Sequence, residues 1–230
     1  MENKNKNWIY PLVILGILLI CIYSCKKPND NNNTPTSSTI TDIDGNVYHT
    51  VTIGTQVWMA ENLKVAHYRN GDTIPNVTDQ TTWEGRTAGA YCLYNATSRI
   101  PYGALYNFYA VSDSRNLAPQ GWHVPSDAEW AIMKNVLGGY EIAGGKLKET
   151  GYAHWQNPNT GATNETGFTA LPGGFRTNSF TQMTTNGYWW SLTAESSDWA
   201  YYVYLDYSNS QFDRSQYPMF YGFSVRCLRD

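Results

Sequence analysis

Short apolar segments separated by turn-forming residues fill the chain from about residue 40 onward, and this pattern limits the possible folds most. Residues 47–53, 187–192 and 199–205 are rich in β-branched and aromatic side chains, and asparagine, serine, glycine and aspartate lie between such segments. Runs of this kind favour antiparallel strands joined by hairpins. Long amphipathic segments are scarce. We therefore expect one α+β domain of short antiparallel strands with two or three helices.

The domain is predicted to open with a β-hairpin. Residues 47–53 are β-rich, as are the residues that follow Gly54 and Thr55, and this pair fits a two-residue turn. The polar segment 71–89 is expected to form a long loop, followed by a short strand within residues 90–94. Further strands are predicted at residues 168–171, 187–192, 199–205 and 222–227.

The clearest helix signal begins at Ser126. Glu129 follows three residues later and completes a capping box, and Asp127 adds a favourable negative charge at the helix N-terminus. The helix is expected to end at the glycine pair 138–139. A second helix, short and buried, is expected within the apolar residues 103–111.

The first 24 residues have the three parts of a secretory signal peptide. A polar start with two lysines precedes sixteen apolar residues at 8–23, and the small Ser24 follows. The segment that ends in Cys25 resembles the lipobox of bacterial lipoprotein precursors, whereas Cys21 fits poorly because the bulky Ile20 precedes it. The alternative is an uncleaved membrane-anchor helix, although the apolar run is shorter than the roughly 20 residues that usually span a bilayer.

Cys25 is therefore expected to carry the lipid that holds the protein in the membrane, as an outer-membrane lipoprotein of the bacterial cell envelope. Such cysteines carry two or three acyl chains, and two or more lipid signals give stable attachment. Residues 26–39 contain no aliphatic or aromatic side chain and predict a flexible tether. The expected divisions are a signal peptide at 1–24, the lipidated cysteine with a linker at 25–40, and a folded extracytoplasmic domain at 41–230.

Two cysteines, Cys92 and Cys227, remain after the signal peptide is removed and Cys25 is lipidated. An even pair in an oxidising compartment predicts one disulfide between them, with two buried unpaired thiols as the alternative. The chain carries a formal net charge of −3 at pH 7 and offers no basic patch, so nucleic acid is not an expected partner.

No pattern in the sequence predicts a metal or a cofactor. None of the four histidines is spaced from other ligand residues as metal ligands are, and His123 is expected to be a structural loop residue rather than a base. Residues 42–46 look like the start of a calcium loop, but Ile53 stands where the closing glutamate belongs, which favours a plain turn. Residues 154–159 contain amides and a proline, as calcium loops of lectins can. The first carboxylate after them is Glu165, which argues against calcium-dependent sugar binding there.

Four motifs lie in order along the folded part, at residues 44–63, 121–126, 164–174 and 222–227. Together they resemble the Fibrobacter succinogenes major paralogous domain, and the resemblance covers essentially all of the folded part. That family occurs largely in secreted and lipid-anchored proteins of Bacteroidetes and Fibrobacteres. The resemblance implies a similar location and no established biochemical activity.

The ending at residues 222–227 and the Gly-Gly-Phe-Arg segment at 173–176 are more distantly similar to the formylglycine-generating-enzyme group. The fold of that group is a variant of the C-type lectin fold, so the resemblance implies a single C-type-lectin-like domain. The group's oxidase holds copper with a closely spaced cysteine pair. Because Cys92 and Cys227 are far apart in this sequence, no catalytic residue carries over.

Aromatic residues of the last third of the chain supply the candidate ligand-binding face. Alternate residues of a strand share a face, so Trp199 and Tyr201 are expected to lie opposite Tyr202. One set is expected in the core, and the other is a candidate platform, because tryptophan and tyrosine combine an apolar face with a polar edge. A wholly buried cluster is the alternative. The candidate binding residues are Trp189, Trp190, Trp199 and Tyr201.

These observations predict a lipid-anchored extracytoplasmic binding or cell-surface interaction module without catalytic activity. The expected partners are the membrane, through the lipid on Cys25, and a glycan or a surface protein. The alternative is an extracytoplasmic enzyme, either a diverged relative of the formylglycine-generating group or a carbohydrate-active hydrolase. A hydrolase of that kind needs two carboxyl groups about 5 to 10 Å apart, a separation that a sequence does not reveal.

Overall fold

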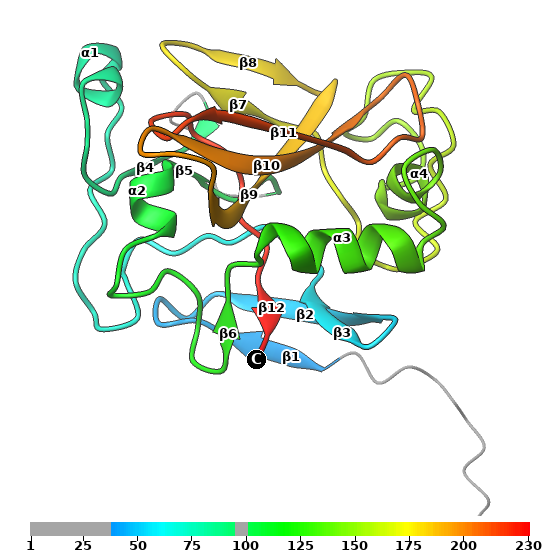
Figure 1. Ribbon diagram of the computed structural model, residues 1–230, viewed down its shortest axis with the longest axis horizontal. Coiled ribbons are helices and arrows are strands. Elements are labelled where there is room, and N and C mark those ends of the chain that lie inside the picture. The colour runs from blue at the N-terminus through cyan, green and yellow to red at the C-terminus, as the bar shows by residue number, and fades with distance from the viewer. Residues whose placement is uncertain (1–37, 95–100) are drawn as a thin grey trace, which may run out of the picture. The chain divides into compact units, whose positions relative to one another are not determined.

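The computed structural model describes residues 38–94 and 101–230 (Figure 1). They belong to one compact unit, which spans Thr36–Asp230. The fold is mixed and β-rich, with four short helices among the described residues. The predicted signal peptide, Cys25 and most of the predicted linker lie outside the described residues. The end of that linker is part of a sheet, because the first strand, β1, already begins at Thr39.

The first sheet joins the beginning and the end of the folded part. Its strands are, in spatial order, β1 (Thr39–Thr41), β2 (Val47–Ile53), β3 (Gln56–Met59), β12 (Leu228–Arg229) and β6 (Trp122–His123). The predicted hairpin is confirmed, because β2 and β3 pair antiparallel with Ile53 opposite Gln56. Gly54 has a φ of 61° in the turn, a backbone conformation that glycine adopts easily. The last strand, β12, lies beside β3, far from it in the sequence (Figure 1).

The second sheet comes mostly from the last third of the chain. Its strands are, in spatial order, β11 (Asp213–Pro218), β10 (Trp199–Asp206), β9 (Asn186–Ala194), β7 (Gly173–Arg176) and β8 (Phe180–Met183). The predicted strands at 187–192 and 199–205 are confirmed as β9 and β10. Strand β11 escaped prediction because it is mostly polar and lies at the edge of the sheet, where it pairs with β10 alone. A third, two-stranded sheet pairs β4 (Tyr91–Cys92), where a strand was predicted, with β5 (Leu105–Tyr106).

The four helices are α1 (Gln80–Glu84), α2 (Phe108–Val111), α3 (Asp127–Val136) and α4 (Ala143–Leu147). Helix α3 begins where the sequence predicts, and both hydrogen bonds of the capping box between Ser126 and Glu129 are present. The sequence predicts only two or three helices, and the additional one, α1, lies inside the expected loop 71–89. It forms there because the Asp79 side chain accepts a hydrogen bond from the Thr82 N–H and caps the helix.

One predicted helix is shorter than expected, and two predicted strands are wrong. A short buried helix, α2, does lie within 103–111, but it takes only the end of that segment, because residues 105–106 form β5 and the Asn107 side chain caps the helix after it. Segment 168–171 forms only an isolated bridge, since two of its carbonyl oxygens accept hydrogen bonds from the Arg226 guanidinium instead of from a strand. Segment 222–227 is likewise divided among isolated bridges to different parts of the chain.

Helix α3 lies between the two large sheets, as Figure 1 shows. Its Trp130 packs with a ring-centroid distance of 4.6 Å against Trp58 of the first sheet. The same cluster contains Trp189 and Val203 of the second sheet, so the helix connects the apolar faces of both sheets. A second aromatic cluster lies around Phe223, whose ring centroid is 4.4 Å from that of Trp190. These two clusters fix the position of β9 and β10.

Candidate functional site

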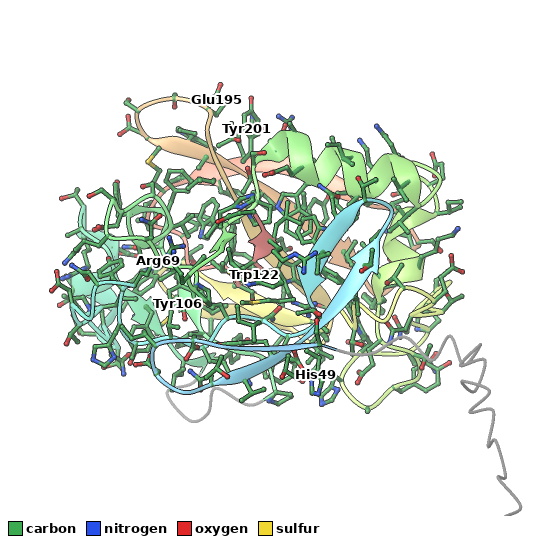
Figure 2. The ribbon with its side chains drawn as sticks, turned by 90° about the horizontal axis from the view of Figure 1, so that it is seen from below. His49, Arg69, Tyr106, Trp122, Glu195 and Tyr201 are labelled. Atoms are coloured by element: carbon green, nitrogen blue, oxygen red, sulfur yellow. The ribbon has the colours of Figure 1, made fainter. Side chains whose placement is uncertain are left out.

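Helix α3 covers one face of β10 only in part. Val203 and Leu205 lie on that face and are buried in the cluster that contains the helix's tryptophan. Because alternate residues of a strand share a face, Trp199 and Tyr201 belong to the same face of β10. Figure 2 shows Tyr201 beside the beginning of α3 at Asp127, and Trp199 comes two residues before Tyr201 on the strand. The sheet face therefore changes from buried to exposed where the helix begins.

Strand β11 completes an exposed strip on this face. The antiparallel register places Gln216 opposite Tyr201 and Pro218 opposite Trp199. The guanidinium of Arg214 lies over the Tyr201 ring, with 3.7 Å between its carbon and the ring centroid. Trp199, Arg214 and Gln216 are exposed and Tyr201 is partly exposed. The outer strip is defined as Trp199, Tyr201, Arg214 and Gln216.

Arg214 fixes the geometry of the outer strip. Its Nε donates a hydrogen bond to the Asp127 carboxylate in the first turn of α3, and this bond is the main reason why the pKa of Arg214 is raised. The guanidinium therefore stays charged and is attracted to the electron-rich face of Tyr201. A second hydrogen bond joins the helix to the second sheet, because the Asp127 N–H donates to Thr193 Oγ1 of β9 at 3.0 Å. The ring of Tyr201 is thus held in place by Arg214, which is itself bound to helix α3.

Trp199 is the exposed tryptophan of the described chain. Of the nine tryptophans, Trp8 lies outside the described residues, and seven of the other eight are buried. Trp199 keeps 41% of its surface exposed. A large aromatic side chain left in water forgoes the favourable free energy of burial, so the exposure of Trp199 is informative when the same protein buries its other described tryptophans.

Polar groups surround Trp199 at the tip of the β9–β10 hairpin. The N–H groups of Glu195 and Ser196 both donate to the Trp199 carbonyl oxygen, at 2.8 and 3.1 Å, and hold the turn. The exposed side chain of Glu195, labelled near Tyr201 in Figure 2, makes no hydrogen bond or ion pair with another described residue. Its carboxylate and the Gln216 amide are therefore available to a ligand that lies on the aromatic rings.

The other two candidate residues are buried, so their assignment to a binding face is wrong. Trp189 and Trp190 are 1% and 0% exposed. Their indole N–H groups donate inside the protein, from Trp189 to Asn62 Oδ1 and from Trp190 to the Tyr106 carbonyl oxygen, both at 2.8 Å. The physical reason is that β9 is a central strand with a core cluster on each face. The structure therefore brings Trp199 and Tyr201 together at the surface and leaves Trp189 and Trp190 in the core.

The predicted disulfide between Cys92 and Cys227 is wrong, because both cysteines are free and buried. Cys92 lies on β4 in a small cluster with Trp83 and Leu105, whereas Cys227 belongs to the large cluster around Phe223. Two separate apolar environments hold the thiols. Burial raises the pKa of Cys92 to about 11, and it also raises the pKa of Cys227, so both remain protonated at neutral pH. The predicted lipidation at Cys25 lies outside the described residues.

Each of the four histidines pairs with a carboxylate that the sequence spacing did not reveal. The pairs are His49 with Glu61, His67 with Asp44, His123 with Glu129 and Asp230, and His154 with Glu149. Within residues 38–94 and 101–230, no group of three or more histidine, cysteine or acidic side chains is arranged to hold a metal ion. Over the same ranges, no helix combines the length and apolar character that crossing a membrane requires.

The turn at 42–46 is closed by its own hydrogen bonds. The Asp42 carboxylate accepts from the N–H groups of Asp44 and Asn46, both at 2.9 Å, and from the Tyr48 hydroxyl at 2.6 Å. An aspartate that accepts from the backbone two residues on forms an Asx turn. The carboxylate that a calcium loop would use is therefore committed to the turn.

The family model of the Fibrobacter succinogenes major domain matches residues 51–229 of the chain. The chain belongs to this family. No curated protein and no solved structure matches the chain.

Three of the four motifs that identify a Fibrobacter succinogenes major domain in this chain meet at Arg226. Its guanidinium donates to Asn62 Oδ1 at 2.8 Å and to the carbonyl oxygens of Phe168 and Thr169 at 2.5 and 3.1 Å. Burial lowers the pKa of Arg226, and its ring contact is also internal, over Phe168 at 4.2 Å. These family motifs therefore hold the fold together, and the outer strip lies outside them.

Two further buried cations escaped sequence reasoning. Arg176 donates to the carbonyl oxygens of Val77, Thr78 and Asp79 and lies over the Trp83 ring at 4.5 Å. Lys148 is the third such cation, and its Nζ donates to three carbonyl oxygens at 2.7 to 3.0 Å. For Arg176 the available signal was a basic residue at the end of an apolar segment with no acidic residue near it in sequence, whereas Lys148 precedes Glu149 directly and gave no such signal.

Proposed function

We propose that this protein is an extracytoplasmic binding module, without catalytic activity, that recognises glycans through the outer strip. The exposure of Trp199 next to Tyr201, in a chain that buries its other described tryptophans, is the observation that carries the proposal. Aromatic rings of this kind lie against the apolar face of a sugar ring, while their polar edges and neighbours bind hydroxyl groups.

The chemistry around the rings suits a neutral, hydroxyl-rich ligand. Arg214 is already neutralised by Asp127, so the outer strip carries little free positive charge. Gln216 supplies amide donors and acceptors, and the exposed Glu195 carboxylate supplies acceptors for sugar hydroxyls. Because the rings stand on paired strands, little conformational entropy is lost when a ligand binds. A shallow platform of this type fits a glycan chain better than a small molecule that requires enclosure.

For the architecture we propose a C-type-lectin-like domain. The observations that support this assignment are the pairing of β12 with β3, which brings the ends of the domain together, and the helix α3 between two separate sheets. The outer strip then lies on the second sheet, away from the sheet that contains both ends of the domain.

The membrane attachment that we propose is lipid on Cys25, which would place the domain on the outer membrane. The support is the signal peptide, the lipobox-like segment and the polar tether in the sequence. A Cys25→Ala variant should lose incorporation of radioactive palmitate, whereas Cys21→Ala should keep it. Palmitate incorporation that persists in Cys25→Ala would contradict this assignment.

A glycan array tests the proposed function. Wild-type domain from residue 36 onward should bind a defined subset of glycans, and the Trp199→Ala variant should lose that binding. Leu192→Ala is the matched control, because Leu192 is 40% exposed on the neighbouring strand β9 but does not belong to the outer strip. Absence of glycan binding by the wild type, or equal binding by Trp199→Ala, would contradict the proposal.

A further inference from the structure

A pocket of about 290 Å³ lies between the turn after β1 and the loop that precedes β6. None of its lining residues belongs to the outer strip. Its inner wall is apolar and buried, with Val65, Leu117 and Ala118. Its lip carries Ile43, which is 50% exposed. Ligand pockets usually measure about 300 to 1,000 Å³, so a pocket of this size takes only a small ligand or one end of a larger one.

One cation, Arg69, lies in the wall of this pocket. Its Nε donates to the Ala118 carbonyl oxygen at 2.8 Å, and its Nη2 donates to those of Pro119 and Trp122 at 2.9 and 2.6 Å. All three acceptors are neutral carbonyls, and Arg69 forms no ion pair with another described residue. The three bonds hold the guanidinium in place and leave Nη1 without a hydrogen-bond partner among the described residues. Figure 2 labels Arg69 in the view from below.

Asp42 lies in the same wall but forms no ion pair with Arg69. Both carboxylate oxygens of Asp42 accept hydrogen bonds from their own turn, Oδ1 from Asp44 and Asn46 and Oδ2 from Asn46 and Tyr48. A guanidinium that has a free Nη1, forms no ion pair among the described residues and lies beside the apolar Val65, Leu117 and Ala118 is suited to a carboxylate, which it binds with charge-assisted hydrogen bonds.

We propose that this pocket binds a compact ligand that combines a branched aliphatic group with a carboxylate. The carboxylate accepts hydrogen bonds from Arg69 Nη1, and the aliphatic group lies against Val65, Leu117 and Ile43. Either a free branched-chain acid or the C-terminal residue of a peptide offers this chemistry. The site is separate from the outer strip, so it does not depend on the proposed glycan binding.

The test compares charged and neutral probes on the full chain, purified in detergent. The first pair is 4-methylpentanoate with 4-methylpentanamide, and the second is a short peptide ending in leucine with a free carboxylate or with an amide. Saturable binding measured by NMR should be at least about tenfold tighter for each carboxylate than for its amide. Tighter binding of the leucine-ending peptide than of 4-methylpentanoate identifies the C-terminal residue of a peptide, rather than a free acid, as the ligand. Equal affinity within both pairs, or no saturable binding of either carboxylate, overturns the proposal.

Two variants assign any binding to this pocket. Arg69→Gln should abolish the preference for carboxylate over amide. Because Arg69 also supports the loop before β6, Ile43→Ser provides a second test at a position that is 50% exposed. It should weaken carboxylate binding by at least about threefold, since an apolar contact is lost. Val47→Ser is the control, because Val47 is also 50% exposed and does not line the pocket. Equal effects of the two serine variants contradict the assignment.

Discussion

Lys148, Arg176 and Arg226 are buried cations that bind backbone carbonyl oxygens rather than carboxylates. A buried charge is costly unless hydrogen bonds replace its water, and each of these side chains has at least three acceptors. Most of these carbonyls belong to loops, and two others, those of Met59 and Asp206, are at the last residues of β3 and β10. Single side chains of this kind therefore fix the loop geometry of a domain that has many turns and few helices.

Lys148 offers the clearest test of this role. Replacing it by methionine keeps the apolar stem but leaves the carbonyl oxygens of Thr160, Asp206 and Asn209 without their donor. The free energy of unfolding, measured by urea denaturation, should fall by at least about 2 kcal/mol. Lys146→Met is the matched control in the last turn of α4, two residues before Lys148, because Lys146 forms a surface ion pair with Glu165, and it should change stability by less than about 1 kcal/mol. A similar loss in both variants would contradict the role given to Lys148.

The sequence predicted the members of the outer strip only in part. Alternation along a strand correctly places Trp199 and Tyr201 on one face of β10. Whether a strand is central or at an edge depends on pairing with distant segments, so the burial of Trp189 and Trp190 on β9 was not predictable. The missed Arg214 is a surface residue of an unpredicted strand, and only the folded structure brings it over Tyr201.

At the scale of elements, His123 connects α3 to the first sheet. Its Nε2 lies 2.9 Å from Glu129 Oε1 on the helix, and its Nδ1 lies 2.7 Å from Asp230 Oδ1, next to β12. Burial alone would lower the pKa of His123, but the hydrogen bonds to the two carboxylates outweigh it and raise the pKa. Glu129 also completes the capping box of α3, so this contact joins the start of the helix to β6 and β12.

The stability that His123 contributes should depend on pH. Because its pKa is higher in the folded protein than in the unfolded chain, the contribution is complete below the unfolded value of about 6.5. It is lost as the pH rises through the folded value. The difference in the free energy of unfolding between wild type and His123→Gln should therefore be larger at about pH 6 than at about pH 9. A difference that stays constant or grows with pH would contradict the predicted contact.

Elements with strong local signals were predictable, and elements that depend on distant partners were not. The hairpin of β2 and β3 has its own turn residues, and α3 has its own cap, so both follow from short segments of sequence. Strand β11 has no apolar pattern and exists because β10 offers an edge. Segments such as 222–227 look like strands, yet the positions of several distant segments decide what they pair with.

At the scale of the whole molecule, the folded part is held together by core clusters and buried cations and has no covalent cross-link among its described residues. The cysteines at 92 and 227 belong to different clusters, each satisfied by apolar neighbours. A thiol assay of the domain from residue 36 onward, denatured without reductant, should therefore detect two free thiols per molecule. Detection of none, with two appearing only after reduction, would show that the pair is a disulfide.

If glycans bind on the outer strip as proposed, the indole N–H signals of the tryptophans should report the binding. The domain from residue 36 onward contains eight tryptophans, and Trp199 is the exposed one. In a ¹H–¹⁵N NMR titration with the strongest glycan from the array, the Trp199 indole signal should shift most and saturate with the binding curve. The buried Trp58 and Trp130 should stay unchanged. Saturable glycan binding that leaves the Trp199 signal in place would contradict the account.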